Sequence, residues 1–274
     1  MKNIWVPLSG QIAQQRKVET IANNIANANT AGFKKDRLTF KEHLTALDKG
    51  LEDIDIPREE WSPKDFYKSQ GSQNAYVKVD GSYTIFEQGQ LQPTKNTLDF
   101  ALFGNGFFEV HTPSGVRYTR KGTFALSKEG HLVNENGFKV LKQSESKDQN
   151  NNLDPKAIED RYITIPPGSR LSVSKEGEIF SQEGSLGNLS VVEFKDSNAL
   201  MKQGQSLFSN KHAQNIASES STTVNQGFIE GSNVNAVQEM SELIKAHRHF
   251  ENIQKAISTY DSISGKAVND IAKF

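Results

Sequence analysis

The clearest helical pattern of the chain is VQEMSELIKAHRHFENIQKAISTYDSISGKAVNDI, residues 237–271. Its apolar residues follow one another in steps of three and four, which is typical of a single helical face. Besides His247, this predicted stripe contains Val237, Met240, Ile244, Phe250, Ile253, Ile257, Tyr260, Ile263, Ala267 and Ile271. Ser232 and Asn233 are good N-cap residues, so we expect the helix to begin there. Forty helical residues extend about 60 Å, which is longer than a compact domain of this size needs.

A shorter helical pattern lies at the opposite end of the sequence. Pro7 is tolerated in a first turn, and Gly32 supplies a C-terminal turn at the end of the predicted helix. One face carries the apolar residues Ile4, Leu8, Ile12, Val18, Ile21, Ile25 and Ala28. The opposite face is polar and carries Gln11, Gln14, Gln15, Lys17, Asn23, Asn24 and Asn27.

Neither terminal helix is expected to be stable alone. Burial of a ten-residue apolar stripe contributes on the order of 20 kcal/mol. Fixing the backbone conformation of forty residues costs about 1–2 kcal/mol per residue. Helical hydrogen bonds recover only part of that difference. We therefore predict that each helix becomes ordered by packing on the other helix or on neighbouring subunits.

Between the two helices the pattern changes to short apolar runs separated by glycines. Residues 48–75 contain Pro57 and Pro63 and are predicted to be an irregular linker. Strands are predicted at 76–79, 82–86, 98–102, 107–110, 162–165 and 189–194, and Gly104 and Gly106 are placed in a hairpin turn. Short strands without intervening helices favour an antiparallel sandwich or barrel. The predicted fold class is therefore α+β, with long terminal helices around a central antiparallel β-rich domain.

A short internal repeat, an internal echo of one segment in another, supports the prediction of a β-rich domain. LSKEGHLVNENG, residues 126–137, aligns without gaps on VSKEGEIFSQEG, residues 173–184. Each copy is predicted to form a hairpin that turns at Glu-Gly, where Gly130 or Gly177 adopts a positive φ.

Composition excludes several classes of function. The 32 basic and 33 acidic residues give a net charge of -1, which provides no field to attract nucleic acid. The chain has no cysteine, which excludes disulfides and thiolate chemistry. The N-terminus lacks the apolar core of a cleaved signal peptide, and no stretch approaches the roughly 20 apolar residues that span a bilayer.

No catalytic, metal-binding or cofactor-binding residue is assigned. Among His111, His131, His212, His247 and His249 there is no pair at metal-binding helical spacing. Gly104-Asn105-Gly106 lacks the third glycine of a dinucleotide-binding fingerprint. Residue types alone leave a two-carboxylate hydrolase open, but the carboxylates considered are expected to lie in turns or point outward: Asp99, Glu109, Glu129, Glu135 and Glu176.

Three separated motifs carry a family resemblance. VETIANNIANANTAGFK (18–34), LDFALFGNGFF with YTRKGTF (98–108 and 118–124) and QGFIEGSNVNAVQEM with HRHFE (226–240 and 247–251) occur in this order. Together they resemble the bacterial flagellar basal-body rod and hook family, and are most similar to the proximal rod proteins of the FlgF type.

The resemblance implies a structural subunit of the periplasm-spanning rod, which transmits torque from motor to hook. It implies that the terminal helices pair as a coiled-coil-like inner domain of a helical tube, with the β-rich domain outside. The implied partners are other rod proteins, further copies of this chain and the flagellar type III export apparatus; no nucleic acid, small-molecule substrate or cofactor is implied. The corresponding division is 1–47 (helix and connector), 48–75 (linker), 76–225 (β-rich domain) and 226–274 (C-terminal helix).

The expected subunit-interface residues lie on the two helices. They are Leu8, Ile12, Val18, Ile21, Asn23, Asn24, Ile25, Asn27, Val237, Met240, Ile244, Phe250, Ile257 and Tyr260. The Asn cluster could fix helix register between subunits, or form an exposed polar face. Gly32, Gly104, Gly106, Gly130 and Gly177 are the expected turn positions.

Other functions stay open at this point. His247-Arg248-His249 stands where hook and distal-rod relatives usually show Gln-Arg-Ala, so a distal-rod or hook-type subunit is an alternative to a proximal one. From other classes, a peptidoglycan-acting enzyme or an adhesin with a coiled-coil terminus is considered. Enzymatic activity in the isolated β-rich domain would distinguish the enzyme from the structural subunit.

Overall fold

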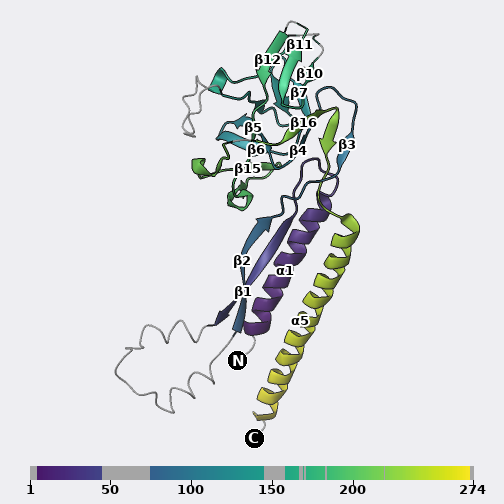
Figure 1. Cartoon of the computed structure of the whole chain (residues 1–274). Coiled ribbons are helices and arrows are strands. Elements are labelled where there is room, and N and C mark those ends of the chain that lie inside the picture. The colour runs from purple at the N-terminus through teal and green to yellow at the C-terminus, as the bar shows by residue number, and fades with distance from the viewer. Residues whose placement is uncertain are drawn as a thin grey trace, which may run out of the picture. The chain divides into compact units, whose positions relative to one another are not determined.

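The computed structural model describes residues 5–44, 75–144, 158–166, 169, 171–182, 184–218 and 220–271. Helices lie at both ends and strands between them, as Figure 1 shows, and this confirms the α+β class. The predicted linker 48–75 falls almost entirely outside the described residues. None of the described helices is both long enough and apolar enough to cross a membrane.

The chain divides into two compact units. A helical unit contains residues 1–25, 36–83 and 236–274, and a β-rich unit contains residues 26–35 and 84–235. Each unit is built from segments that are distant in sequence, and the chain passes from one unit to the other after residues 25, 35, 83 and 235.

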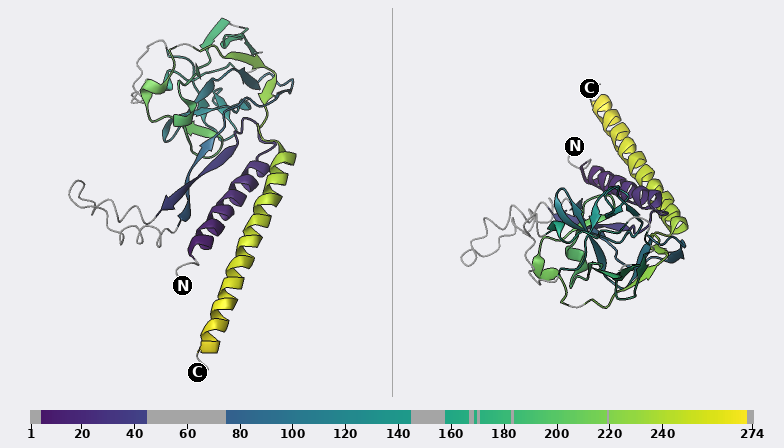
Figure 2. Two further views of the ribbon diagram at one scale, coloured as in Figure 1. Left: turned by 60° about the horizontal axis from the view of Figure 1, so that its bottom comes forward. Right: turned by 90° about the horizontal axis from the view of Figure 1, so that it is seen from above.

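The helical unit consists of two helices and one pair of strands. Its elements are α1 (Trp5–Ala26), β1 (Asp36–Leu44), β2 (Ala75–Thr84) and α5 (Ala236–Ile271). Strands β1 and β2 pair with each other, and α1 lies between this pair and α5 (Figures 1 and 2). Thr39 Oγ1 donates a hydrogen bond to the carbonyl of Gly81 across the strand pair at 3.2 Å.

Two predictions for this unit were wrong. Residues 36–44, DRLTFKEHL, form a strand that was missed, because their charged residues resemble those of a connector. Residues 76–79 and 82–86 were predicted as two strands broken at Gly81, but β2 continues through this glycine. The carbonyl of Gly81 accepts a hydrogen bond from Thr39 of β1, so Gly81 lies within the strand pair and does not form a turn.

The C-terminal helix α5 begins at Ala236, three residues after Asn233. The prediction that Ser232 or Asn233 caps this helix was wrong, because the Asn233 side chain binds the backbone of Lys35, Ile85 and Glu87 instead. Gly265, which has open space around it, does not interrupt α5.

The β-rich unit is built from short antiparallel strands. One sheet has the order β14-β15-β6-β5-β9-β8-β7, with β13 paired to β5; β10-β11-β12, β16-β4 and β17-β3 form the smaller groups. Two 3-10 helices, η2 (Ser197–Ala199) and η3 (Ala213–Asn215), complete the unit. The strands are β3 (Leu91–Pro93), β4 (Phe100–Phe103), β5 (Phe107–Thr112), β6 (Gly115–Thr119), β7 (Phe124–Leu126), β8 (Leu132–Asn134), β9 (Lys139–Val140), β10 (Ser172–Val173), β11 (Glu178–Ser181), β12 (Gly184–Asn188), β13 (Val191–Val192), β14 (Met201–Lys202), β15 (Leu207–Ser209), β16 (Thr223–Gln226) and β17 (Phe228–Glu230).

Both copies of the internal echo form the predicted hairpins. Strands β7 and β8 pair around Gly130, whose φ is 80°, and β10 and β11 pair around Gly177, whose φ is 89°. By contrast, the predicted hairpin at Gly104 and Gly106 is wrong. Strand β4 pairs with β16 and β5 pairs with β6, so these glycines connect two sheets. A side chain on Gly106 would come within 2.8 Å of Thr222 Oγ1, which explains why no larger residue fits there.

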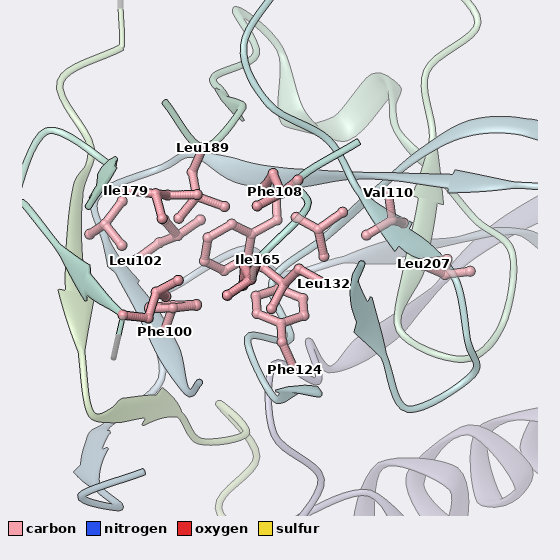
Figure 3. Packing of buried hydrophobic residues seen from close by; sticks show 14 residues of the cluster. Phe100, Leu102, Phe108, Val110, Phe124, Leu132, Ile165, Ile179, Leu189 and Leu207 are labelled. Atoms are coloured by element: carbon pink, nitrogen blue, oxygen red, sulfur yellow. The ribbon is translucent and has the colours of Figure 1, made fainter. Parts of the chain in front are cut away.

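The core of the β-rich unit lies on both sides of β5. Phe108 and Val110 point into the larger cluster and Phe107 into a smaller one, as the two-residue period of a strand requires. Figure 3 shows the larger cluster, in which the Phe108 and Phe124 rings meet edge to face at 5.3 Å between centroids. The cluster consists of Phe100, Leu102, Phe108, Val110, Phe124, Leu132, Val140, Ile163, Ile165, Leu171, Ile179, Leu189, Leu207 and Val224.

Candidate functional site

The three sequence motifs meet at one place in the β-rich unit. Gly32 donates its backbone N–H to the carbonyl of Glu230 at 2.7 Å. It has a φ of +67°, and an added Cβ would lie 2.5 Å from the backbone nitrogen of Lys121. Gly32 was predicted to end the N-terminal helix, but α1 already ends at Ala26. Its backbone instead allows the first motif to pack directly against the second.

A fully buried ion pair lies at this meeting point. Lys34 Nζ donates to Glu230 Oε1 and to the carbonyl of Glu87, each at 2.6 Å, and neither charged side chain reaches solvent. Burial lowers the pKa of the Lys34 ammonium below its ordinary value, and the Glu230 carboxylate opposes this shift. The backbone N–H of Gly89 also donates to Glu230 Oε1 at 2.8 Å. Glu230 therefore joins the first and third motifs.

Arg120 brings the second motif to the same carboxylate. Its Nη1 lies 3.5 Å from Glu230 Oε2, and its Nη2 donates to the carbonyl of Gly104. Its guanidinium also lies over the Phe107 ring, 5.1 Å from the centroid. Burial lowers the pKa of Arg120, with Glu230 opposing, but an arginine remains charged throughout the physiological range. Two buried cations thus share one buried carboxylate.

Asn233 closes the cluster on the side of the third motif. Its Oδ1 accepts from the backbone N–H of Lys35 at 2.8 Å, and its Nδ2 donates to the carbonyls of Ile85 and Glu87. We call Gly32, Lys34, Arg120, Glu230 and Asn233 the motif junction. Three of the four points at which the chain enters or leaves the β-rich unit lie within ten residues of a junction residue, and Asn233 binds the backbone of Ile85, two residues after the fourth. The junction therefore fixes where the segments leading to both helices leave the β-rich unit.

In the helical unit, Asn24 ties α1 to both neighbouring elements. Its side chain donates to the carbonyl of Asp36 at 2.9 Å and accepts from the Asp36 N–H at 3.0 Å. It also donates to the buried carboxylate of Glu239 on α5 at 3.4 Å. These bonds give Asn24 partners inside its own chain, which an exposed polar face would not. Asn23 is exposed, and Asn27 is half-buried and accepts from Thr30 Oγ1 at 3.3 Å.

The apolar residues that were predicted to form a single stripe on α5 lie on two different faces of the helix. Each step of three residues falls about 60° short of a full turn, so the three consecutive steps from Ile244 to Ile253 lead to the opposite side of the helix. The inner face is half-buried or buried and consists of Leu243, Ala246, Phe250, Ile253 and Ile257. The outer ridge consists of Val237, Met240 and Ile244, whose side chains are 75%, 51% and 55% exposed.

The inner face of α5 is the one directed at α1. A Cβ built on Gly10 of α1 would lie 3.8 Å from Ile253 Cδ1. Of the other predicted interface residues, Ile12 and Tyr260 are exposed, Leu8, Val18 and Ile25 are half-buried, and Ile21 is buried. The structure thus divides the predicted residues into a set used within the chain and a set left on its surface.

The carboxylates considered for catalysis do not share one environment. Glu109 and Asp99 are buried, so the expectation that such groups are solvated was wrong for these two. Glu109 accepts hydrogen bonds from Arg161 and from Ser190 Oγ, the latter at 2.7 Å. An arginine-paired carboxylate at the centre of a sheet satisfies its charge within the core. Among the described residues, no group of three histidine, aspartate or glutamate side chains is arranged to hold a metal ion.

Comparisons with known proteins agree with this geometry. Three protein-family models match: the flagella basal body rod protein family over residues 6–34, the flagellar hook protein FlgE/F/G D1 domain over 101–181 and the flagellar basal body rod FlgEFG protein C-terminal domain over 225–270. The flagellar basal-body rod protein FlgG of Borreliella burgdorferi is 33% identical over 98% of both chains. The chain belongs to the flagellar basal-body rod and hook family.

Further relatives carry both subunit names. FlgG of Bacillus subtilis is 31% identical over 82% of this chain and 78% of its own. FlgF of Caulobacter vibrioides is 30% identical over 82% of this chain and 79% of its own. Family membership gives this rod-family chain a structural role in the flagellar basal body and in motility.

The junction residues of this rod-family chain were missed as a site. Lys34, Arg120 and Glu230 each lie inside one of the three motifs, but a charged residue is usually solvated, so the sequence alone predicts no interaction between them. The available signal was their position beside glycines, in Gly32-Phe33-Lys34 and Glu230-Gly231. Close backbone packing at those glycines is what buries the neighbouring charges.

Proposed function

We propose that this chain is a structural subunit of the flagellar rod that assembles with other rod proteins and with copies of itself through its terminal helices. The observation that carries this proposal is the outer ridge of α5, which leaves large apolar side chains in solvent on a helix of 36 residues. Contiguous exposed apolar surface marks an interaction site. Family membership supports the rod as the assembly in which this site is used.

The finer features of the proposal concern the assembled state. The terminal helices form the coiled-coil-like inner domain of a helical tube, and the β-rich unit forms its outer layer. The two helices carry the subunit contacts, through the predicted residues from Leu8 to Asn27 and from Val237 to Tyr260. The rod spans the periplasm and transmits torque from motor to hook, and the chain reaches it through the flagellar type III export apparatus without a cleaved signal.

The motif junction supports the torque-bearing part of this proposal. A shaft subunit must pass force between its inner helices and its outer domain without shearing. Lys34, Glu230 and Asn233 hold the connecting segments by charged or multiple hydrogen bonds in a dry environment, where such bonds are strongest. No catalytic residue is needed for this role, and we propose that the chain is not an enzyme.

Truncation at the unit boundaries tests the proposal. Residues 1–25 and 236–274 belong to the helical unit, whereas Gly32 and Lys34 belong to the β-rich unit, so a clean deletion removes only the former segments. We expect a chain lacking residues 236–274 to be stable but absent from basal bodies and to leave cells non-motile. A truncated chain that still supports motility would contradict the proposal, as would cell-wall cleavage by the purified full chain.

Position along the rod is a separate question. We propose a proximal, FlgF-type position from the overall similarity of the motifs, and the FlgF relative of Caulobacter vibrioides supports it. The second candidate is a distal, FlgG-type position, which the full-length match to FlgG of Borreliella burgdorferi favours. Tracing this sequence in a density map of the intact basal body decides between them: a layer next to the motor supports the first, and a layer next to the hook supports the second.

A further inference from the structure

An apolar groove runs along α1 on the side away from α5. It is an open groove of about 570 Å³ between α1 and the β1–β2 pair, and its apolar lining consists of Ile12, Ala13, Leu38, Val77 and Val79. Ile12 and Val77 are 54% and 41% exposed, which is unusual for large apolar side chains that face each other across a groove.

Hydrogen bonds hold the two walls of the groove together at both ends. At one end, the backbone N–H of Val77 donates to Ser9 Oγ at 3.1 Å. At the other, the Asn24 side chain makes two hydrogen bonds to the backbone of Asp36. Where α1 is folded against the strand pair, these hydrogen bonds therefore set the width of the groove.

The outer ridge of α5 has the form of such an occupant. Val237, Met240 and Ile244 stand at positions i, i+3 and i+7, the anchor spacing of a helix that binds in an apolar groove. The charged residues in this part of α5, Glu239 and Glu242, are buried or half-buried, so the ridge brings no unpaired charge into the groove. Two of the charged groups that line the groove, Arg16 and Glu19, form an ion pair with each other at 3.2 Å.

The ridge cannot reach the groove of its own chain. Within the helical unit α1 lies between the strand pair and α5 (Figures 1 and 2). The groove lies between α1 and the strand pair, whereas the ridge residues are exposed on α5 and lie outside its buried inner face. A second copy placed beside the outer side of the first α5 can present to the ridge the groove between its own strand pair and its own α1. In this contact α1 has two helical partners, the α5 of its own chain and the α5 of a neighbouring copy.

We propose that the outer ridge of α5 binds the α1 groove of a second copy of this chain. This inference rests on the proposed function and specifies its contact. Because the two surfaces differ, the contact is head-to-tail and does not close on a pair; repeated, it generates a ring or an open helical array. The few side chains involved fall well short of the roughly 20–30 residues per side of a stable interface. The contact therefore forms in the assembled rod, where it is repeated, and not between two isolated chains.

Engineered disulfides test this contact directly, because the chain has no cysteine of its own. The variant Ile12→Cys/Ile244→Cys places one thiol in the groove and one on the ridge. We expect oxidation of basal bodies that contain it to give a ladder of dimers and larger species. Ile244→Cys alone should give no dimer, and neither should Ile12→Cys/Val268→Cys, because Val268 is also an exposed residue of α5 but lies outside the ridge.

Two outcomes would overturn the contact: basal bodies that contain the double variant but yield no ladder, or a dimer from Ile244→Cys alone. Either result leaves the rod function standing, whereas absence of the unsubstituted chain from basal bodies would refute the rod function itself. Met240→Ala/Ile244→Ala gives a second readout. We expect at least about tenfold less incorporation into basal bodies, with the unfolding temperature of the isolated chain unchanged. Incorporation equal to that of the Val268→Ala control would also overturn the contact.

Discussion

The two units of this molecule treat apolar and charged residues in opposite ways. In the β-rich unit, phenylalanines such as Phe100 and Phe108 are fully buried, and even the charges of Lys34 and Glu230 are removed from water. In the helical unit, Val237 is 75% exposed, and residues 258–269 of α5 are exposed. The first unit buries a continuous apolar core and its central charges, whereas the second leaves the ridge of α5 in solvent for a partner to cover. The difference indicates that the β-rich unit is complete before assembly, whereas the helical unit is not.

The largest effect is expected from Glu230→Gln at the motif junction. The substitution leaves Lys34 and Arg120 buried without their shared counter-charge, and breaking a buried pair in this way costs about 3–5 kcal/mol. Denaturant unfolding of the purified chain measures this loss. Lys34→Met should cost less, because Arg120 and Glu230 remain as a balanced pair. Equal losses for the two variants would refute the shared-carboxylate account.

A smaller loss is expected from Gly32→Ala. The new Cβ meets the backbone of Lys121 at a residue with a φ of +67°, so strain and overlap together should cost about 2–3 kcal/mol. Gly137→Ala is the matched control, since Gly137 has a φ of +79° and no atom within 4 Å of an added Cβ. It should cost only about 1 kcal/mol. If the control is as destabilising as Gly32→Ala, close packing at the junction is not the cause.

The pH dependence of the β-rich unit is expected to include Glu193. Partial burial raises the pKa of this carboxyl. Hydrogen bonds from Thr222, Ser221 and Ser220 lower the pKa, and their combined effect is larger, so the net pKa lies below its ordinary value of 4.5. A lowered folded-state pKa means that the stabilisation is present above pH 4.5 and is lost as the pH falls through the folded-state pKa. Glu193→Gln should therefore flatten the acid side of the stability curve, by on the order of 1 kcal/mol. An unchanged acid limb would contradict this assignment.

The smallest effect on stability is expected at the outer ridge of α5. Val237→Ser should change the free energy of unfolding of the isolated chain by less than about 0.5 kcal/mol, because the side chain is already exposed. Phe108→Ala, in the core, should cost about 3–5 kcal/mol in the same denaturation measurement. A ridge variant that destabilises the isolated chain would show that the ridge is covered within it.

Sequence patterns predicted the elements that depend on local chemistry. Both terminal helices and the two Glu-Gly hairpins are set by periodicity and by glycines that adopt a positive φ, and these were predicted correctly. Strand β1 was missed because its stability comes from pairing with β2, more than thirty residues away. The split of the α5 stripe could have been found by following its steps of three around the helix.

The junction could not be predicted in the same way. Burial of Lys34 depends on the simultaneous approach of Glu87, Glu230 and Arg120, which lie in separate segments of the sequence. No local sequence pattern indicates that a lysine side chain will be excluded from solvent. The same holds for two asparagines. Asn24 was predicted to be a subunit contact and Asn233 a helix cap, but the side chains of both bind the backbone of their own chain.

Hydrogen–deuterium exchange of the full chain, free and in purified basal bodies, tests most directly whether assembly completes the helical unit. In the free chain at low concentration, we expect amides of α1 and of the C-terminal half of α5 to exchange rapidly, while those of β5 and β6 stay protected. In basal bodies, α1 and α5 should become protected and the β-rich unit should change little. Strong protection of both helices in the free chain, equal to that of β5, would contradict the account.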